Sequence, residues 1–402
     1  MKYIIILGDG MADEPIGSIG NKTVIQSAHT PYMDLLANNG RNGLLDTIPK
    51  GFSPGSEIAN LSVLGYNVPE VYEGRGVLEA ASIGIDIHSD EMAMRCNLVS
   101  LDGELIKNHS AGHISTAEAS ELIHFLDENL GDKTFSFHSG VSYRHVLKMK
   151  NGSKYLNCTP PHDIPEKPFK PYLIKPERSE ANETADALNN LIFKSQEILK
   201  YHPINLKRVS EGKDPANSIW PWSPGFRPKM KPLYEMFPIK SGSVISAVDL
   251  IRGIGVYAGL EVIMVEGATG LYDTNYEGKA KAALKALKEK DFVYLHIEAS
   301  DEAGHEGDVD LKIKTVEYLD KRIVKPIYEE IINWDEPVTI AILPDHPTPC
   351  ATRTHTREPI PFLIWHKDIT PDSVKTYDEF AAHNGIYGLL HSDQFMKILF
   401  NI

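Results

Sequence analysis

Three segments of the chain, far apart in the sequence, each place an aspartate, a histidine or both just past the expected end of a strand. They are Ile6–Gly10, Glu298–His305 and Leu343–Pro349, the last followed by Thr354–Thr356. Short apolar runs that are typical of buried parallel strands lead into this pattern. Open α/β sheets bind ligands at the carboxyl ends of their parallel strands. The sequence therefore predicts an α/β fold in which the three segments meet at one edge of the sheet.

The side chains of these segments have the chemistry of a metal site. They supply three carboxylates and three imidazoles, from Asp9, Asp301, Asp345, His305, His346 and His355. A mixed oxygen and nitrogen set suits Mn²⁺, Zn²⁺ or a similar divalent ion. A fourth segment, Ser53–Glu57, adds the hydroxyl of Ser56 in a turn. Metal ions beside a free hydroxyl indicate phosphoryl transfer.

Each of these residues also has a simpler interpretation. Asp9 and Ser56 could be helix N-caps, Ser56 at the start of a helix over 57–64. Asp301 and His305 are four residues apart, so they share a face only if the chain is helical there. Asp345 and His346 could bind one ion, two different ions, or one of them could merely support a ligand. For Ser56, capping and nucleophilic attack are compatible roles.

Composition limits the partners of the protein. The chain has 402 residues and a formal net charge of −14, which argues against binding to nucleic acids or anionic membranes. A phosphorylated substrate therefore requires local cations. The three cysteines are scattered, and the N-terminal apolar run is too short for a signal peptide. We expect a reducing, cytoplasmic location and no membrane segment.

The pattern of elements predicts a split domain. Strands and helices alternate from about residue 244 onward, with helices over 276–289 and 309–332 and strands over 292–297 and 338–343. This alternation is typical of a mostly parallel sheet flanked by helices. Between 88 and 180 the order is different: strands, a helix over 116–130, more strands, then a proline-rich stretch at 158–176. We expect one α/β domain formed by 1–87 and 181–402, interrupted by a smaller α+β domain at 88–180.

Longer motifs add a family resemblance. The matching segments are Leu7–Asp13, Pro54–Tyr66, Gly74–Ala81, Ser142–His145, Pro161–Ile164, Trp220–Trp222, Ala268–Tyr276 and Pro344–Pro349. With these segments the chain resembles the archaeal-type cofactor-independent phosphoglycerate mutases of the alkaline phosphatase superfamily, over essentially its whole length. The resemblance implies conversion of 3-phosphoglycerate to 2-phosphoglycerate without 2,3-bisphosphoglycerate.

The resemblance also implies roles for individual residues. One metal ion would be held by Asp9, Ser56, Asp345 and His346, and a second by Asp301, His305 and His355. Mn²⁺ is the preferred metal, with Zn²⁺ and Mg²⁺ as alternatives. Ser56 would form a phosphoserine. In the inserted domain, Arg144, His162 and Asp163 would face the substrate, with Asp163 as a proton carrier. Charge alone adds Arg227 and Lys240 as substrate ligands.

Two positions depart from the family pattern: Asn60, where mutases often have histidine, and Pro347, where serine is common. Neither removes a metal ligand. They leave open a homoserine kinase-like phosphotransferase, a phosphohydrolase, or a fold relative that only binds ligands. No P-loop or glycine-rich kinase signature is present to hold ATP in the usual way.

Overall fold

The computed structural model describes residues 1–402, which form two compact units. The larger unit comprises Met1–Tyr72 and Lys229–Ile402, and the smaller unit is Glu73–Pro228. An inserted domain is therefore present, but its boundaries lie at 73 and 228 rather than at 88 and 180. The physical reason is a late strand, β9 (Ser218–Phe226), which pairs with β3 (Glu91–Asp102) from Met92 opposite Phe226 to Val99 opposite Ser218.

The larger unit is built on an eight-stranded sheet with the order β11-β10-β12-β1-β13-β14-β2-β15. The central strands β1 (Lys2–Gly8), β12 (Phe292–Ile297) and β13 (Val338–Leu343) are parallel and completely buried. They consist almost entirely of apolar residues, as strands covered on both faces must. The sheet is mostly parallel, as expected, because β14 (Ile360–Trp365) is the strand that pairs antiparallel with its neighbours.

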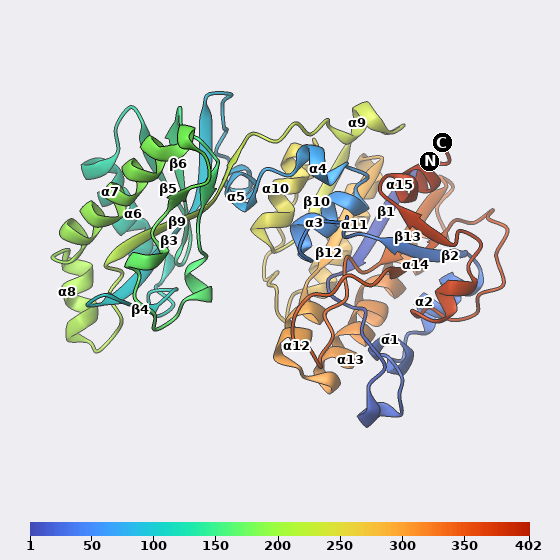
Figure 1. The fold of residues 1–402 in the computed structure, drawn as a ribbon. Coiled ribbons are helices and arrows are strands. Elements are labelled where there is room, and N and C mark those ends of the chain that lie inside the picture. The colour runs from blue at the N-terminus through green and yellow to red at the C-terminus, as the bar shows by residue number, and fades with distance from the viewer. The chain divides into compact units, whose positions relative to one another are not determined.

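The remaining strands of this sheet are β2 (Arg41–Asp46), β10 (Gly242–Ile245), β11 (Glu261–Val262) and β15 (Leu389–His391). Helices flank the sheet (Figure 1). α11 (Tyr276–Glu289) packs on β10, β12 and β1, whereas α10 (Asp249–Tyr257) packs on β10 and on α3 (Ser56–Val63). The other helices include α1 (Val24–Ser27), α2 (Pro31–Asn38), α4 (Val68–Val71), α9 (Leu233–Met236), α12 (Ala299–Glu306) and α15 (Gln394–Phe400).

The expected single helix over 309–332 is interrupted. It consists of α13 (Val309–Tyr318), a π-helical turn (Leu319–Val324) and α14 (Lys325–Ile331). Pro326 lies in the first turn of α14. Proline has no N–H to donate and clashes with the preceding turn, so the regular hydrogen-bond ladder cannot run through it. The wider turn accommodates this break.

The smaller unit is an α+β structure. Its five-stranded sheet has the order β4-β3-β6-β5, with β9 paired to β3, and includes β4 (Leu105–Asn108), β5 (Phe135–Val141) and β6 (Arg144–Lys150). The short strands β7 (Leu156–Asn157) and β8 (Lys175–Pro176) form a separate pair. Its helices are α5 (Arg75–Ser82), α6 (Thr116–Leu130), α7 (Asn182–Leu199) and α8 (Pro203–Ser210). α6 covers β5 and α7 covers β9.

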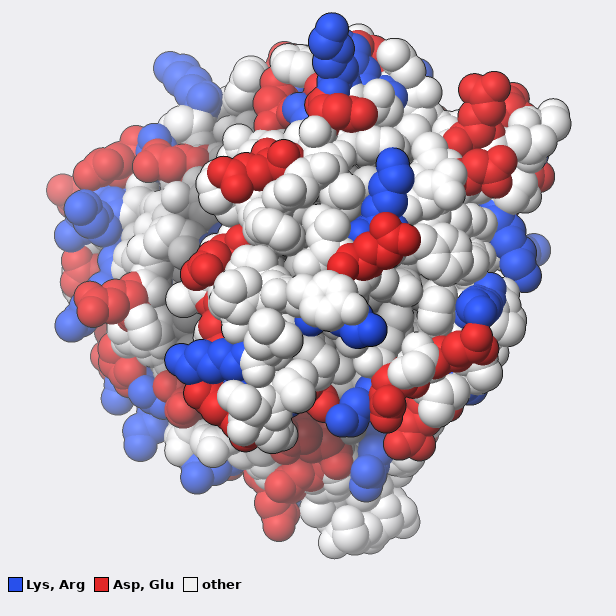
Figure 2. Space-filling model, turned by 90° about the vertical axis from the view of Figure 1, so that its left-hand side faces the viewer, with Lys and Arg blue, Asp and Glu red and all other residues white.

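The surface view in Figure 2 shows Lys and Arg side chains interspersed with Asp and Glu. No helix combines the length and the apolar composition that a membrane span requires.

Candidate metal centre and phosphoryl-transfer site

The strand order brings the three predicted segments together in the larger unit. β1 lies between β12 and β13, with Gly8 opposite Ile297 and Leu7 opposite Leu343. Asp9 follows β1 directly, and Asp345 follows β13 after one intervening residue. α12 begins two residues after β12 and carries Asp301 and His305 on one face. The carboxyl ends of neighbouring parallel strands thus deliver all three carboxylates to one edge.

A first cluster gathers around His346. Its Nε2 lies 3.6 Å from Asp9 Oδ1, 3.6 Å from Asp345 Oδ2 and 3.1 Å from Ser56 Oγ. The ligand atoms of Asp9, Asp345 and His346 all lie within 4.8 Å of one another. All three side chains are buried, whereas Ser56 is half-buried. The cluster therefore offers three ligand side chains beside one accessible hydroxyl.

A second cluster is centred on Asp301. Its Oδ2 lies 3.3 Å from His305 Nε2, and its Oδ1 lies 3.3 Å from His355 Nε2. The two imidazole nitrogens are only 3.0 Å apart. His346 is also close, because its ring centroid lies 4.0 Å from that of His355 and it falls within the 4.8 Å group formed with Asp301 and His355. The two clusters are therefore adjacent and meet at His346.

The electrostatics of this edge fit bound cations. Burial, followed by the charges of Asp345 and Asp301, raises the pKa of Asp9 well above its ordinary value. Asp9 Oδ1 is buried and has no hydrogen-bond partner. A buried carboxylate oxygen without a donor is costly unless a cation coordinates it. The donor set of carboxylates and imidazoles is the one that Mn²⁺ and Zn²⁺ accept.

The imidazoles respond to the same field. Burial lowers the pKa of His346, which favours the neutral form that binds metals. The hydrogen bond to Asp301 raises the pKa of His305 to about 9. Although burial opposes ionisation of Asp301, hydrogen bonds from His305 and His355 hold its pKa well below its usual range. Without metal, the second cluster therefore holds a proton on His305, at the position where a metal ion would bind.

Ser56 does not cap its helix. α3 begins at Ser56 itself, its N-cap residue is Gly55, and no side chain makes a capping hydrogen bond there. The Ser56 hydroxyl instead lies beside His346. Asp9 likewise precedes no helix, since a turn follows β1. The capping interpretations of both residues are therefore wrong, and both side chains remain available to the clusters.

A layer of buried polar residues, none of which was predicted to be functional, supports the clusters. His296 Nε2 lies 3.3 Å from Asp9 Oδ2, and its Nδ1 lies 3.1 Å from Glu298 Oε1. Glu298 is in turn paired with the fully buried Lys279 at 2.9 Å. Thr348 Oγ1 donates to Asp301 Oδ1 at 2.6 Å. The continuous buried pattern of β12 gives no sign that His296 is functional, because a histidine in a buried strand is usually a core residue.

The predicted substrate residues Arg144, His162 and Asp163 lie in the smaller unit. Arg144 opens β6, is half-buried, and has an Nε with no hydrogen-bond partner. His162 and Asp163 belong to the 3₁₀ turn Pro161–Asp163 and are exposed, with His162 Nε2 3.6 Å from Asp163 Oδ1. The His162 ring packs edge-on against Trp222 at 5.5 Å.

Two further arginines of the smaller unit join this group. Arg95 on β3 is buried, donates to Glu79 Oε1 at 2.9 Å and stacks on Trp222 at 5.0 Å. Burial lowers the pKa of Arg95, and the charges of Arg75 and Arg144 lower it further although Glu79 opposes them. Arg75, Arg95 and Arg144 therefore share one positive environment. Neither Arg75 nor Arg95 was predicted, although Arg75 lies in a matching segment.

Charge alone predicted two substrate ligands, Lys240 and Arg227. Lys240 is exposed and lies two residues before β10, at the amino end of the parallel strands, where its backbone N–H donates to Asp291. The metal clusters are at the carboxyl end, so Lys240 cannot contact a substrate bound there. Arg227 follows β9 in the smaller unit, is exposed, and is ion-paired with Asp86. The net charge indicates that a phosphorylated substrate needs positively charged residues, but it does not indicate which lysines or arginines bind the substrate.

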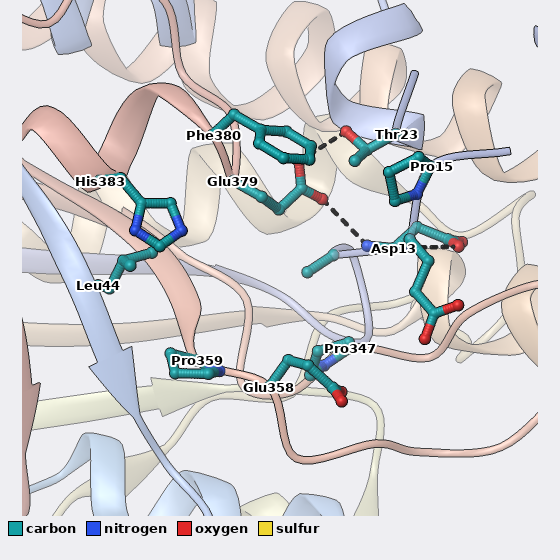
Figure 3. A pocket seen from close by; sticks show the side chains of 12 residues that line it. Asp13, Pro15, Thr23, Leu44, Pro347, Glu358, Pro359, Glu379, Phe380 and His383 are labelled. Atoms are coloured by element: carbon teal, nitrogen blue, oxygen red, sulfur yellow. Dashed lines mark hydrogen bonds between the residues drawn. The ribbon is translucent and has the colours of Figure 1, made fainter. Parts of the chain in front are cut away.

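A cavity of about 280 Å³ lies elsewhere in the larger unit and contains none of the predicted ligands (Figure 3). Its floor includes Asp13 and Thr23, whose backbone N–H and hydroxyl donate to Glu379 at 3.0 and 2.6 Å. Burial raises the pKa of Glu379 to about 7. None of the predicted metal ligands lines this cavity, so the cavity is not the proposed metal site.

Comparison with known proteins places this chain in a family. Residues 37–205 match the family described as 2,3-bisphosphoglycerate-independent phosphoglycerate mutase. Proteins of that name from Methanosarcina barkeri and Methanosarcina mazei are 51% and 50% identical to this chain, in each case over 99% of both chains. The chain belongs to the 2,3-bisphosphoglycerate-independent phosphoglycerate mutases. It is accordingly an enzyme of this type.

Two solved structures are similar to this chain over its whole length. A protein from Pyrococcus horikoshii is similar with a TM-score of 0.85 and 30% identity, over 100% of this chain and 96% of the other. A cofactor-independent phosphoglycerate mutase from Thermoplasma acidophilum is similar with a TM-score of 0.70 and 26% identity, over 100% and 99%. The fold, with its inserted unit, is that of the family.

Proposed function

We propose that this mutase interconverts 3-phosphoglycerate and 2-phosphoglycerate through a phosphoserine at Ser56, with two divalent metal ions and without 2,3-bisphosphoglycerate. One observation carries the proposal: the Ser56 hydroxyl, which caps no helix, lies 3.1 Å from His346 at the meeting point of two carboxylate–imidazole clusters. A structural serine at the start of a helix has no need of such neighbours.

Asp9, Ser56, Asp345 and His346 hold one ion in this proposal, and Asp301, His305 and His355 hold the other. His346 lies within reach of both clusters. Its assignment to the first rests on the 3.1 Å contact of its Nε2 with Ser56. When bound, the ions supply positive charge that favours the ionised serine oxygen and neutralises the phosphoryl oxygens. Mn²⁺ is the preferred ion, and Zn²⁺ and Mg²⁺ are the alternatives.

The protein side chains carry out the transfer in two displacements. Ser56 Oγ forms a bond to phosphorus while the bond to the 3-hydroxyl oxygen of the substrate breaks, and that oxygen takes up a proton. The 2-hydroxyl of the retained glycerate then loses a proton and bonds to phosphorus, releasing Ser56. The Ser56 hydroxyl loses its proton in the first displacement and regains one in the second, so each displacement conserves protons. Asp163 is the proposed proton carrier.

The smaller unit supplies the cations that a net charge of −14 makes necessary. Arg144, with its unpartnered Nε, and the neighbouring Arg75 and Arg95 are the proposed ligands of the substrate carboxylate and phosphate. His162 adds a hydrogen-bond donor beside them. Water must be excluded during the transfer, since hydrolysis of the phosphoserine would turn the mutase into a phosphatase.

The decisive experiment compares wild-type protein with Ser56→Ala in an enolase-coupled assay with 3-phosphoglycerate, Mn²⁺ and no 2,3-bisphosphoglycerate. We expect turnover by the wild type, none by the variant, and a phosphorylated Ser56 peptide by mass spectrometry after acid quenching. An active Ser56→Ala enzyme refutes the covalent step. Release of inorganic phosphate alone indicates a phosphohydrolase, and ADP formation from ATP and homoserine without mutase turnover indicates a kinase-like enzyme.

A further inference from the structure

Asn60 lies at the centre of a buried hydrogen-bond chain that ends on a proposed metal ligand. It is fully buried on α3, one helical turn after Ser56. Its Nδ2 donates to the backbone oxygen of Ser56 at 2.8 Å and to Asp345 Oδ2 at 2.8 Å. Its Oδ1 accepts from the hydroxyl of Tyr294, a buried residue of β12. The side-chain amide thus uses both protons and its oxygen.

The neighbours of Asn60 fix the direction of its amide. Ser56 O and the Asp345 carboxylate can only accept hydrogen bonds at this position, so they require the NH₂ group. The tyrosine hydroxyl donates and requires the oxygen. A flipped amide would place its oxygen against two acceptors and leave the hydroxyl proton without a partner, which is costly in a buried site. Ser56 O and Asp345 therefore determine which way Asn60 faces, and Tyr294 donates to the amide oxygen that this orientation leaves.

Asn60 completes the set of donors around Asp345. The backbone N–H groups of Gly10 and His346 donate to Asp345 Oδ1 at 3.1 and 2.9 Å. Asn60 supplies the donor to Oδ2, the oxygen that lies 3.6 Å from His346 Nε2. A carboxylate held at both oxygens has a fixed plane. The same amide also anchors the first turn of α3, which carries the nucleophile.

We infer that Tyr294 and Asn60 form a positioning relay that orients Asp345 as a metal ligand and ties it to the Ser56 end of α3. Neither residue touches the substrate. The relay joins three elements of the larger unit, β12, α3 and the segment after β13. It rests on the proposed metal role of Asp345, and it adds that affinity for the ion at the first cluster depends on two residues outside the ligand set.

The test is Mn²⁺ binding to the full chain, measured by calorimetry, with 3-phosphoglycerate absent. We expect two ions on the wild type. In Asn60→Ala, one of the two should bind about 10- to 100-fold more weakly, the usual effect of losing a hydrogen-bond partner of a ligand, while the other is unchanged. Tyr294→Phe should give a smaller loss at the same ion, and Asn60→His, which keeps one donor and one acceptor, should recover most of the affinity.

Ser62→Ala is the matched control. Ser62 lies on the same helix, is buried, and has a hydroxyl without a hydrogen-bond partner. It should bind both ions as the wild type does. Equal losses in Ser62→Ala and Asn60→Ala, or unchanged affinity in Asn60→Ala, would overturn the relay. If Asn60→Ala does not fold, the test uses Tyr294→Phe and Asn60→His instead. Wild-type affinity for Mn²⁺ in Tyr294→Phe would then refute the inference. A wild type that binds no Mn²⁺ would instead refute the proposed metal centre.

Discussion

Replacing Asp9 by asparagine should have opposite effects on stability with and without metal. In the metal-free protein, Asp9 is buried among carboxylates, and its ligand oxygen lies within 4.8 Å of that of Asp345. Burial and the neighbouring charges of Asp345 and Asp301 raise its pKa well above the ordinary value. Asparagine keeps an acceptor for His296 but removes the charge. Metal-free Asp9→Asn should therefore unfold at a higher temperature than the wild type.

The size of the effect follows from electrostatics and from the length of the chain. Two unit charges about 5 Å apart repel by about 3 kcal/mol at an effective dielectric constant near 20, and protonation and the attraction of His296 reduce the net gain to about 1–2 kcal/mol. In a protein of this size that gain corresponds to a rise of about 1–2.5 °C. A carboxyl whose folded pKa is raised, as that of Asp9 is, loses its contribution to stability as the pH rises through that value, and asparagine removes this loss.

With saturating Mn²⁺ the order should reverse. A metal ion at 100 times its dissociation constant stabilises the folded state by about 2.7 kcal/mol. The variant loses most of this for one ion, and so should melt below the wild type. The assay is thermal unfolding by circular dichroism at pH 7.5, in chelator and in Mn²⁺. Asp46→Asn, which lies on β2 and pairs with His391, is the control without reversal. Asp9→Asn that is destabilised equally in both conditions would refute the reasoning.

Four further outcomes test other parts of the structure. Lys279→Met should lower the free energy of unfolding by about 3–5 kcal/mol in urea titrations, because it leaves the buried Glu298 without its lysine counter-ion; a loss below 1 kcal/mol contradicts this. Glu379→Gln should gain about 2 kcal/mol over the wild type between pH 5 and pH 8.5, since the pKa of Glu379, raised to about 7 by burial, makes the wild type lose stability as the pH rises; pH-independent differences in urea unfolding would argue against it. Arg144→Gln should raise KM for 3-phosphoglycerate at least tenfold with folding intact, whereas Lys148→Gln on the same strand should not. Chelation should abolish activity and Mn²⁺ should restore it. Full activity after exhaustive dialysis against chelator would refute the proposed metal centre.

Local sequence rules were sufficient where one helix or strand is set by its own residues. α6 and α11 have the predicted bounds of 116–130 and 276–289, and the two strands β12 and β13 begin and end as expected. β9 was missed because its two prolines indicate a loop. Proline is tolerated in a strand at a sheet edge, and β9 pairs on one side only, with β3. That single pairing also moved the boundary of the inserted unit to 228.

Part of the candidate site was likewise predictable from local sequence, and the rest was set by the tertiary structure. Aspartates and histidines near strand ends indicated six of the seven proposed metal ligands, because strand ends and ligand chemistry can both be recognised in short segments. The seventh, Ser56, came from a turn and from the family resemblance. Tertiary structure alone decided what surrounds them. Asn60, Tyr294 and His296 acquire their roles from partners up to 287 residues away in the sequence. Whether Ser56 capped a helix or faced His346, and whether a given cation lay near the site or at the opposite end of a strand, depended on how the sheet was assembled. Hydrogen bonds and buried charges act over a few ångströms in space, and separation along the chain does not reveal that distance.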